Sequence, residues 1–333
     1  MRAFTLIRAD SPDQAVQALA SHPGARLMAG ATTLFDLMKL GVERPRHVVD
    51  INGIDGMDGI DTGGGRELVF GSLARMSDVA ADARLAADYP ALAESLWRAA
   101  SQQLRNMASL GGNVLQRTRC AYFRGGEPFA CNKRAPGSGC AAIEGLDRGH
   151  ALLGTSEHCI ATYPGDFAVA LVAFDATLDV LGPRGMRALP VEALHRAPGA
   201  RPDLETTLAP DEVIVRIRVP ATPLGRGSTY HKIRDRESYA FALASAAVAV
   251  RLDGGKVQEA RIALGGVATR PWRAREAERM LLGQRLDLAT ALAAGHAAFA
   301  GARVGRHNAF RVDLGARTVA DALSTAARRA ERT

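Results

Sequence analysis

Hydrophobic and polar positions in the first 71 residues change their period every few residues, which predicts short helices and strands in close succession. Ser11, Pro12 and Gln14 form a capping-box pattern, with proline at the first helical position. Gly24 is a stop signal for that helix. Further along, the pattern predicts a strand at 26–29, a helix at 34–40, and strands at 46–51 and 67–71.

Beyond residue 73 helical spacing dominates, and it then gives way to loops. The pattern of residues 74–106 predicts two helices that are separated near Tyr89 and Pro90. Residues 109–160 are rich in turn-forming residues, which indicates a long irregular region. Regular structure is expected again in the apolar stretch 167–181.

The last part of the chain mixes strands and helices. Residues 212–219 alternate, which predicts a strand with Val213, Val215 and Ile217 on one face, and a linker is expected at 220–227. After the linker, the pattern predicts strands at 242–252 and 257–266 joined by the turn Asp253-Gly254-Gly255, and helices near 272–283, 287–301 and 315–330. These elements indicate a mixed α+β protein with a smaller C-terminal unit.

The composition is that of an ordinary globular protein. Of 333 residues, 47% are hydrophobic and 23% are charged, and a chain of this length is expected to contain two or three packed units. The formal net charge is +7, but the arginines are scattered and no basic run is interleaved with aromatic residues. A nucleic-acid partner is therefore not expected. A basic face for an acidic partner subunit suits this charge better.

The sequence contains no long apolar segment. Its first eight residues lack the apolar run of a signal peptide, and no segment approaches the length needed to span a bilayer. We expect a soluble protein that, if it is exported, depends on a signal carried by a partner.

Two glycine-containing turns are candidates for binding phosphate. Residues 30–33, Gly-Ala-Thr-Thr, lie between a predicted strand and a predicted helix, where small residues let backbone N–H groups and the helix N-terminus approach an anion. Ser109, Gly111, Gly112 and Asn113 form the second turn, which suits a backbone nest around a diphosphate. Each turn alone is also typical of an ordinary tight turn. Together they indicate one extended dinucleotide held from two sides.

A third glycine motif does not indicate nucleotide binding. Residues 137–142 fit the G-x-G-x-x-A pattern of dinucleotide-binding proteins. However, the preceding residues 131–136 are not a predicted strand, and the strand is required for that interpretation. NAD binding through such a motif is not expected.

All four cysteines lie within forty residues of one another: Cys120, Cys131, Cys140 and Cys159. Successive members are separated by ten, eight and eighteen residues, and no C-x-x-C pair occurs, so the common structural zinc layouts are not indicated. Disulfides that stabilise a whole fold would be spread more widely. The clustering indicates one local role.

The segments between the cysteines favour an iron–sulfur cluster. Glycine-rich stretches at 125–126 and 137–139 are able to wrap a bulky group, and four thiolates are the usual complement for such a cluster. The alternative is four unrelated cysteines, some of them simply buried. His150 or His158 is also close enough in sequence to replace a cysteine as a ligand.

Asp166 and Lys232 are single polar residues next to apolar segments. Their chemistry alone is typical of surface residues or salt-bridge partners. No Ser/His/Asp arrangement or carboxylate pair is recognisable elsewhere, so the sequence offers no self-contained catalytic site.

Several of these motifs together resemble the FAD-binding subunit of molybdenum hydroxylases, the medium subunit of the xanthine dehydrogenase and carbon monoxide dehydrogenase group. The matching segments are 29–33 (AGATT), 103–113 (QLRNMASLGGN), Gly165-Asp166, Lys232, 265–268 (GGVA) and 270–271 (RP), so that the likeness covers the whole chain. The cysteine-bearing segment resembles a narrower branch, in which the flavin subunit of bacterial periplasmic aldehyde oxidoreductases carries an additional [4Fe–4S] cluster.

This resemblance implies a fold and a domain organisation. The expected fold class is α+β, with a two-part FAD-binding domain of the vanillyl-alcohol-oxidase (PCMH) type and then a small α+β domain of the carbon monoxide dehydrogenase flavoprotein type. The first domain is expected at 1–222, in two parts at 1–55 and 56–222, with the iron–sulfur insert at about 117–160. The C-terminal domain is expected at 223–333.

The resemblance also implies the site residues. It places the FAD pyrophosphate on both glycine turns and Asp166 and Lys232 near the adenosine or flavin portions. The implied FAD-binding residues are Leu27, Met28, Ala29, Gly30, Ala31, Thr32, Thr33, Leu34, Ser109, Gly111, Gly112, Asn113, Asp166, Ile214 and Lys232, and the implied ligands of the [4Fe–4S] cluster are Cys120, Cys131, Cys140 and Cys159. Ala31 stands where many relatives have a second glycine, and Ser109 where many have threonine. Both residues are small enough to keep the backbone accessible.

The function implied by the resemblance is electron transfer within a complex. A molybdopterin-binding large subunit would oxidise the substrate, commonly an aldehyde or a heterocycle. A [2Fe–2S] small subunit would pass the electrons to FAD on this chain, which would pass them to an external acceptor. The complex is expected in the periplasm, by co-export with a partner, or in the cytoplasm. The main alternative is a stand-alone flavin oxidoreductase with its own substrate pocket.

Overall fold

The N-terminal part forms a parallel sheet with two helices. The computed structural model describes residues 1–332. Its first helix begins after Ser11 as predicted, and Ser11 Oγ accepts a hydrogen bond from the Gln14 N–H at 3.2 Å. The elements here are β1 (Thr5–Arg8), α1 (Pro12–Ser21), β2 (Arg26–Met28), α2 (Leu34–Lys39) and β3 (His47–Asp50), with the sheet order β1-β3-β2. Strand β1 was not predicted, because it is mostly exposed and has no apolar alternation.

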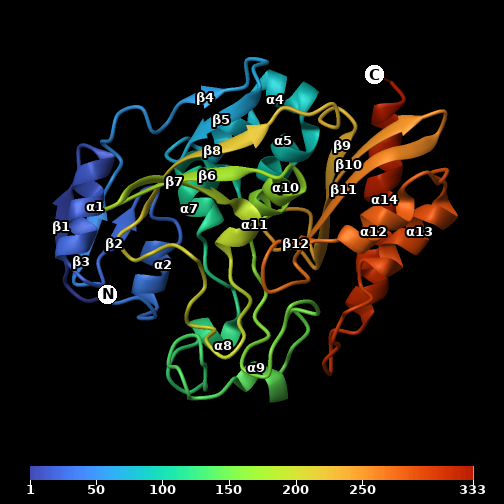
Figure 1. Cartoon of the computed structure of the whole chain (residues 1–333). Helices are drawn as coiled ribbons and strands as arrows, with labels where there is room; N and C mark the ends of the chain where they lie inside the picture. Colours follow the sequence, from blue (N-terminus) through green and yellow to red (C-terminus); the bar gives the residue numbers. More distant parts are fainter. Residues whose placement is uncertain (333) are drawn as a thin grey trace.

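A second, antiparallel sheet follows, with helices packed against it (Figure 1). Its strands are β4 (Ile60–Asp61), β5 (Glu67–Gly71), β6 (Thr177–Gly182), β7 (Gly185–Pro190) and β8 (Val213–Pro220), in the order β4-β5-β8-β6-β7. The predicted strands at 67–71 and 212–219 are therefore confirmed. A short helix, α11 (Val191–Leu194), follows β7.

The predicted face of β8 is wrong in part. Pairing with β6 skips one residue, so that a bulge interrupts the strand at Val215. Val213 and Val215 therefore pack against the N-terminal core, whereas Ile217 is fully buried in the core on the other side. The alternation in the sequence did not reveal this reversal.

The segment 74–106 contains four helices rather than the two that were predicted. They are α3 (Met76–Ala80), α4 (Ala83–Asp88), α5 (Pro90–Trp97) and α6 (Gln102–Met107). The predicted break near Pro90 is present. Additional breaks occur because Asp82 and Ser101 each cap a new helix, accepting hydrogen bonds from the N–H groups of Leu85 and Leu104.

The C-terminal part is a four-stranded antiparallel sheet with three helices on one face (Figure 1). Its elements are β9 (Ser228–Ile233), β10 (Ala244–Asp253), β11 (Lys256–Gly265), β12 (Trp272–Arg273), α12 (Arg275–Leu281), α13 (Leu288–Ala297) and α14 (Phe310–Ala330), and the sheet order is β12-β11-β10-β9. The predicted hairpin is confirmed, and Gly254 and Gly255 have φ angles of +54° and +77° in its turn.

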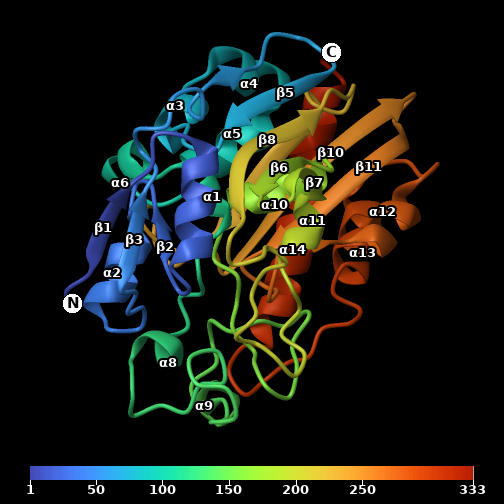
Figure 2. The same cartoon turned by 60° about the vertical axis from the view of Figure 1, so that its left-hand side comes forward.

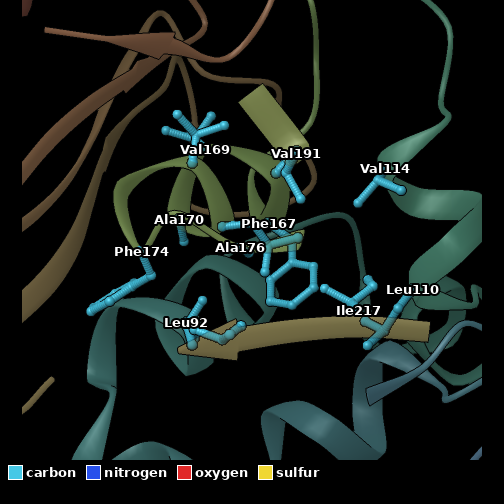
Figure 3. Close-up of a cluster of buried hydrophobic side chains, with 14 of the residues drawn as sticks. Leu92, Leu110, Val114, Phe167, Val169, Ala170, Phe174, Ala176, Val191 and Ile217 are labelled. Carbon is cyan, nitrogen blue, oxygen red and sulfur yellow. The ribbon is translucent and has the colours of Figure 1, made fainter. Parts of the chain in front are cut away.

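Helix α10 (Phe167–Ala173) joins the two antiparallel sheets. Every residue of this helix is buried, and it packs against α5, β10 and β11. Figure 3 shows Phe167 among Leu92, Leu110 and Ile217, which come from α5, α7 (Leu110–Val114) and β8. One hydrophobic core therefore fixes Asp166, at the start of α10, relative to the second glycine turn.

The cysteine-bearing segment projects from this body as loops with two short helices, α8 (Ala121–Arg124) and α9 (Ala141–Glu144) (Figures 1 and 2). It is as poor in regular structure as the sequence predicted. In the part of the chain that the structure describes, no helix combines the length and the hydrophobicity that a membrane span requires.

Candidate functional site

The first glycine turn presents free backbone donors. Ala31 lies between β2 and α2 with a φ of +57°, the left-handed conformation, and Thr33 has the right-handed helical conformation. Across residues 1–332, no hydrogen-bond acceptor is paired with the amide N–H groups of residues 31–34. Successive N–H groups in such a turn form a concave site for an anion. The turn therefore has the geometry that a phosphate group requires.

The first glycine turn packs against the chain just before the second turn. A Cβ atom on Gly30 would lie 1.8 Å from the carbonyl oxygen of Met107, two residues before the second turn begins at Ser109. Arg75 donates to that carbonyl at 2.5 Å and to Asn52 Oδ1 at 3.3 Å, and Asn52 donates to the Ala29 carbonyl at 3.0 Å. Gly30 is therefore needed for this contact, in addition to any approach by a ligand.

The second turn differs from the nest that the sequence predicted. It is the short helix α7, and the N–H groups of residues 110–113 are all bonded to Ser72, Ala74 or Ser109. Neither glycine in it has a positive φ. Its free polar atoms are instead Ser72 Oγ and Asn113 Oδ1, which are buried without a partner in the described chain. Gly112 is exposed, so this turn offers an open backbone surface.

Asp166 and Lys232 form a buried ion pair rather than two surface residues. Each is 5% exposed, and Lys232 Nζ lies 2.8 Å from Asp166 Oδ2. Tyr230 donates to the other carboxylate oxygen at 2.6 Å, and Ser245 Oγ lies 2.8 Å from the Tyr230 hydroxyl. Burial, together with the Asp166 charge, raises the pKa of Tyr230 well above its usual value. The salt-bridge interpretation is therefore correct, and Tyr230 and Ser245 are members that the sequence did not indicate.

The apolar residues implied for the site are buried or half-buried in the elements that carry the two glycine turns or in the core beneath them. Leu27, in β2, packs against the N-terminal core, and Met28 beside it is half-buried. Ile214 is 4% exposed and belongs to the same core as Leu110 of α7. Leu34 is half-buried at the first position of α2. Ile214 therefore supports the second turn from the core.

The four cysteines line one small pocket and form no disulfide. Cys131 and Cys140 are backbone partners across a short antiparallel bridge. Within residues 1–332, no three His, Cys, Asp or Glu side chains are close enough to hold a single metal ion. In an iron–sulfur cluster each thiolate binds a different iron, so the sulfur atoms stand further apart than around one ion. The four thiols therefore form no single-ion site among the described residues.

Polar groups approach two of the sulfur atoms. His150 Nε2 lies 3.2 Å from Cys120 Sγ, and the Ala161 N–H donates to Cys159 Sγ at 3.4 Å. Burial raises the pKa of Cys120 to about 11 and also raises the pKa of Cys159, against the opposing effect of Lys133. The thiols of Cys120 and Cys159 therefore favour the neutral form at neutral pH.

Ala31 offers a direct test of the strained turn. We expect Ala31→Gly to stabilise the protein by about 0.5–1 kcal/mol, because relief of left-handed strain outweighs the added freedom of the unfolded chain. Ala29→Gly is the control, since Ala29 has no positive φ, and it should destabilise by a similar amount. Urea denaturation of both variants measures the difference. Equal destabilisation of both would contradict the strain at Ala31.

Comparison with known proteins identifies the family of this chain. Residues 2–222 match the family described as the FAD binding domain in molybdopterin dehydrogenase, and residues 228–326 match the CO dehydrogenase flavoprotein C-terminal domain. The chain is 44% identical to the aldehyde oxidoreductase FAD-binding subunit PaoB of Escherichia coli K12, over 98% of this chain and 99% of that protein. It is 26% identical to the xanthine dehydrogenase FAD-binding subunit of Escherichia coli O157:H7, over 85% of this chain and 80% of that protein.

A solved structure gives the same result for the fold. Carbon monoxide dehydrogenase from Hydrogenophaga pseudoflava contains a chain that superposes with a TM-score of 0.77 at 28% identity, covering 98% of each chain. The expected fold class, an FAD-binding domain followed by a small α+β domain, is thereby confirmed. The first family match extends over more than half of the sequence. This chain belongs to the family of FAD-binding medium subunits of the molybdenum hydroxylases.

Proposed function

We propose that this chain is the FAD-binding electron-transfer subunit of an aldehyde-oxidising molybdenum hydroxylase. The observation that carries the proposal is the set of free N–H groups at residues 31–34, in a turn that packs against Met107 just before the second glycine turn. Together these groups suit the diphosphate of one dinucleotide. The name of PaoB, an aldehyde oxidoreductase subunit, supports the substrate class.

Each part of the site has a separate task in this proposal. The amides of residues 31–34 bind phosphate oxygens. Asp166, Lys232 and Tyr230 satisfy one another, so they fix the wall of the site in one conformation. Bound FAD supplies the redox chemistry, taking up electrons from a donor and releasing them to an acceptor.

The cysteines are proposed to hold a [4Fe–4S] cluster. All four thiols line the same cavity, and the Ala161 N–H and His150 are positioned to stabilise sulfur charge. When bound, such a cluster supplies a one-electron centre or a structural cross-link for the loops around it. Four unrelated cysteines would have no reason to line a single cavity.

A molybdopterin-binding subunit and a [2Fe–2S] subunit are the proposed partners. The relatives carry names of subunits or chains of aldehyde oxidoreductase, xanthine dehydrogenase and carbon monoxide dehydrogenase. The buried polar groups described above bind one another and leave no constellation for converting an organic substrate. Oxidation of the substrate is therefore assigned to the partners.

Purification separates this proposal from a stand-alone flavin enzyme. Isolated from its native host with an affinity tag, the chain should bring both partners with it, and the complex should oxidise an aldehyde with an artificial electron acceptor. The chain alone should show flavin absorption with an iron–sulfur shoulder and no turnover. Aldehyde oxidation by the isolated chain would contradict the proposal and favour the stand-alone enzyme.

A further inference from the structure

The cysteine-bearing insert is attached to the helix that follows the first glycine turn. Asp36, on α2, accepts hydrogen bonds from Arg119 at 3.1 Å and from Arg124. The two arginines flank Cys120 in the chain, and their side chains are 26% and 17% exposed. The insert therefore holds α2 through two ion pairs on one carboxylate.

An apolar contact accompanies the ion pairs. Leu37 of α2 forms a small buried cluster with Phe123 and Cys131, against which Cys120 packs. Leu37 and Phe123 are each 1% exposed. Two of the four cysteines consequently share their packing with α2. Figures 1 and 2 both show α8 next to the end of the molecule that carries α2.

The segment after α2 is held in the same way. Arg117 pairs with Glu43 and lies 2.7 Å from Glu205, and its guanidinium stacks over the Phe123 ring at 4.6 Å. Burial opposes the pKa increase of Arg117, but the two carboxylates outweigh it and raise the pKa. The insert thus contacts both α2 itself and the segment that follows it.

Any displacement of α2 changes the first glycine turn. The N–H groups of Phe35 and Leu37 bond to the carbonyls of Ala31 and Thr33, so the turn and the helix form one hydrogen-bonded unit. The free amides of residues 31–34 belong to this unit. Their direction depends on where the insert holds the helix.

We propose that Asp36 is a positioning residue for FAD, through which the insert, ordered around its cluster, aligns the amides of residues 31–34. This inference rests on the proposed function, because it takes FAD and the cluster as ligands of the two sites. Occupancy of the cluster site then strengthens FAD binding. By thermodynamic reciprocity, FAD equally strengthens retention of the cluster.

The test is the affinity of the full-length chain for FAD, measured by titration of flavin fluorescence. Asp36→Asn should weaken FAD binding about fivefold. It removes two ion pairs, and because these pairs are part-exposed we expect an effect at the low end of the usual range of coupling between two sites. Asp36→Glu should restore most of the affinity. Asp88→Asn is the matched control, because Asp88 has the same 40% side-chain exposure and pairs with Arg226, remote from α2.

A double-mutant cycle tests the coupling itself. Cys131→Ser should also weaken FAD binding, and adding Asp36→Asn should weaken it little further, because both changes act through the same contact. Additive effects would overturn the coupling. Unchanged FAD affinity in Asp36→Asn would overturn the positioning role, whatever the iron content. Absence of iron in the wild-type chain, measured separately, would overturn the cluster assignment and the coupling with it.

Discussion

Cys131→Ser is expected to lower the iron content of anaerobically purified protein from about four atoms per chain to less than about one. Cys131 is 8% exposed and lines the common cavity with the other three thiols. No further cysteine exists in the sequence to replace it, and a serine oxygen is a much poorer ligand for iron in such a cluster. Iron and sulfide analysis, with low-temperature paramagnetic resonance after reduction, measures the loss.

His158→Gln is the control for this experiment. His158 lines the same cavity but is exposed, and it was a candidate to replace a cysteine as ligand. Iron should remain near the wild-type value in this variant if cysteine supplies all four ligands. Stoichiometric zinc in the wild type, or a disulfide with no iron under anaerobic conditions, would contradict the cluster.

The elements that the sequence predicted are those with local signals. The β10–β11 hairpin follows from the Asp253-Gly254-Gly255 turn, and the start of α1 follows from Ser11, because turn and cap chemistry act over a few residues. The bulge at Val215 depends on a partner strand more than thirty residues away. The reversal that it causes could not be seen from the pattern of the strand itself.

In the candidate site, too, local signals were predicted and contacts between distant residues were not. The sequence indicated both glycine turns, but the second turn is a capped helix whose amides bond to Ser72, Ala74 and Ser109. The Asp166–Lys232 pair joins residues 66 positions apart, and Tyr230 completes it from an unpredicted strand. Such contacts depend on how the sheets pack around α10. That these residues bind FAD, and that the cysteines bind an iron–sulfur cluster, stays a prediction.

Gly112→Val is expected to leave the fold intact and to remove FAD. Gly112 is exposed, has no positive φ, and a Cβ there would meet only Ser109 Oγ, at 3.0 Å. The protein therefore accommodates a side chain, but the side chain covers the exposed backbone of the second glycine turn, to which the proposed function assigns FAD. We expect FAD affinity to fall about tenfold or more, which corresponds to about 1.4 kcal/mol or more. Flavin released per mole of protein and circular dichroism measure the two effects separately.

Gly111→Val provides the contrast, because the neighbouring glycine faces the protein interior. A Cβ at Gly111 would lie 2.9 Å from Ser72 Cβ and 3.1 Å from the Ser72 carbonyl oxygen, to which the Gly111 N–H is bonded. Overpacking of this kind costs about 1–3 kcal/mol, so this variant should unfold at a lower temperature. Loss of flavin with unchanged stability should therefore be specific to Gly112→Val. Full flavin occupancy in a folded Gly112→Val protein would contradict the assignment of FAD to this turn. Lowered stability in both variants would show that the two glycines serve packing alone.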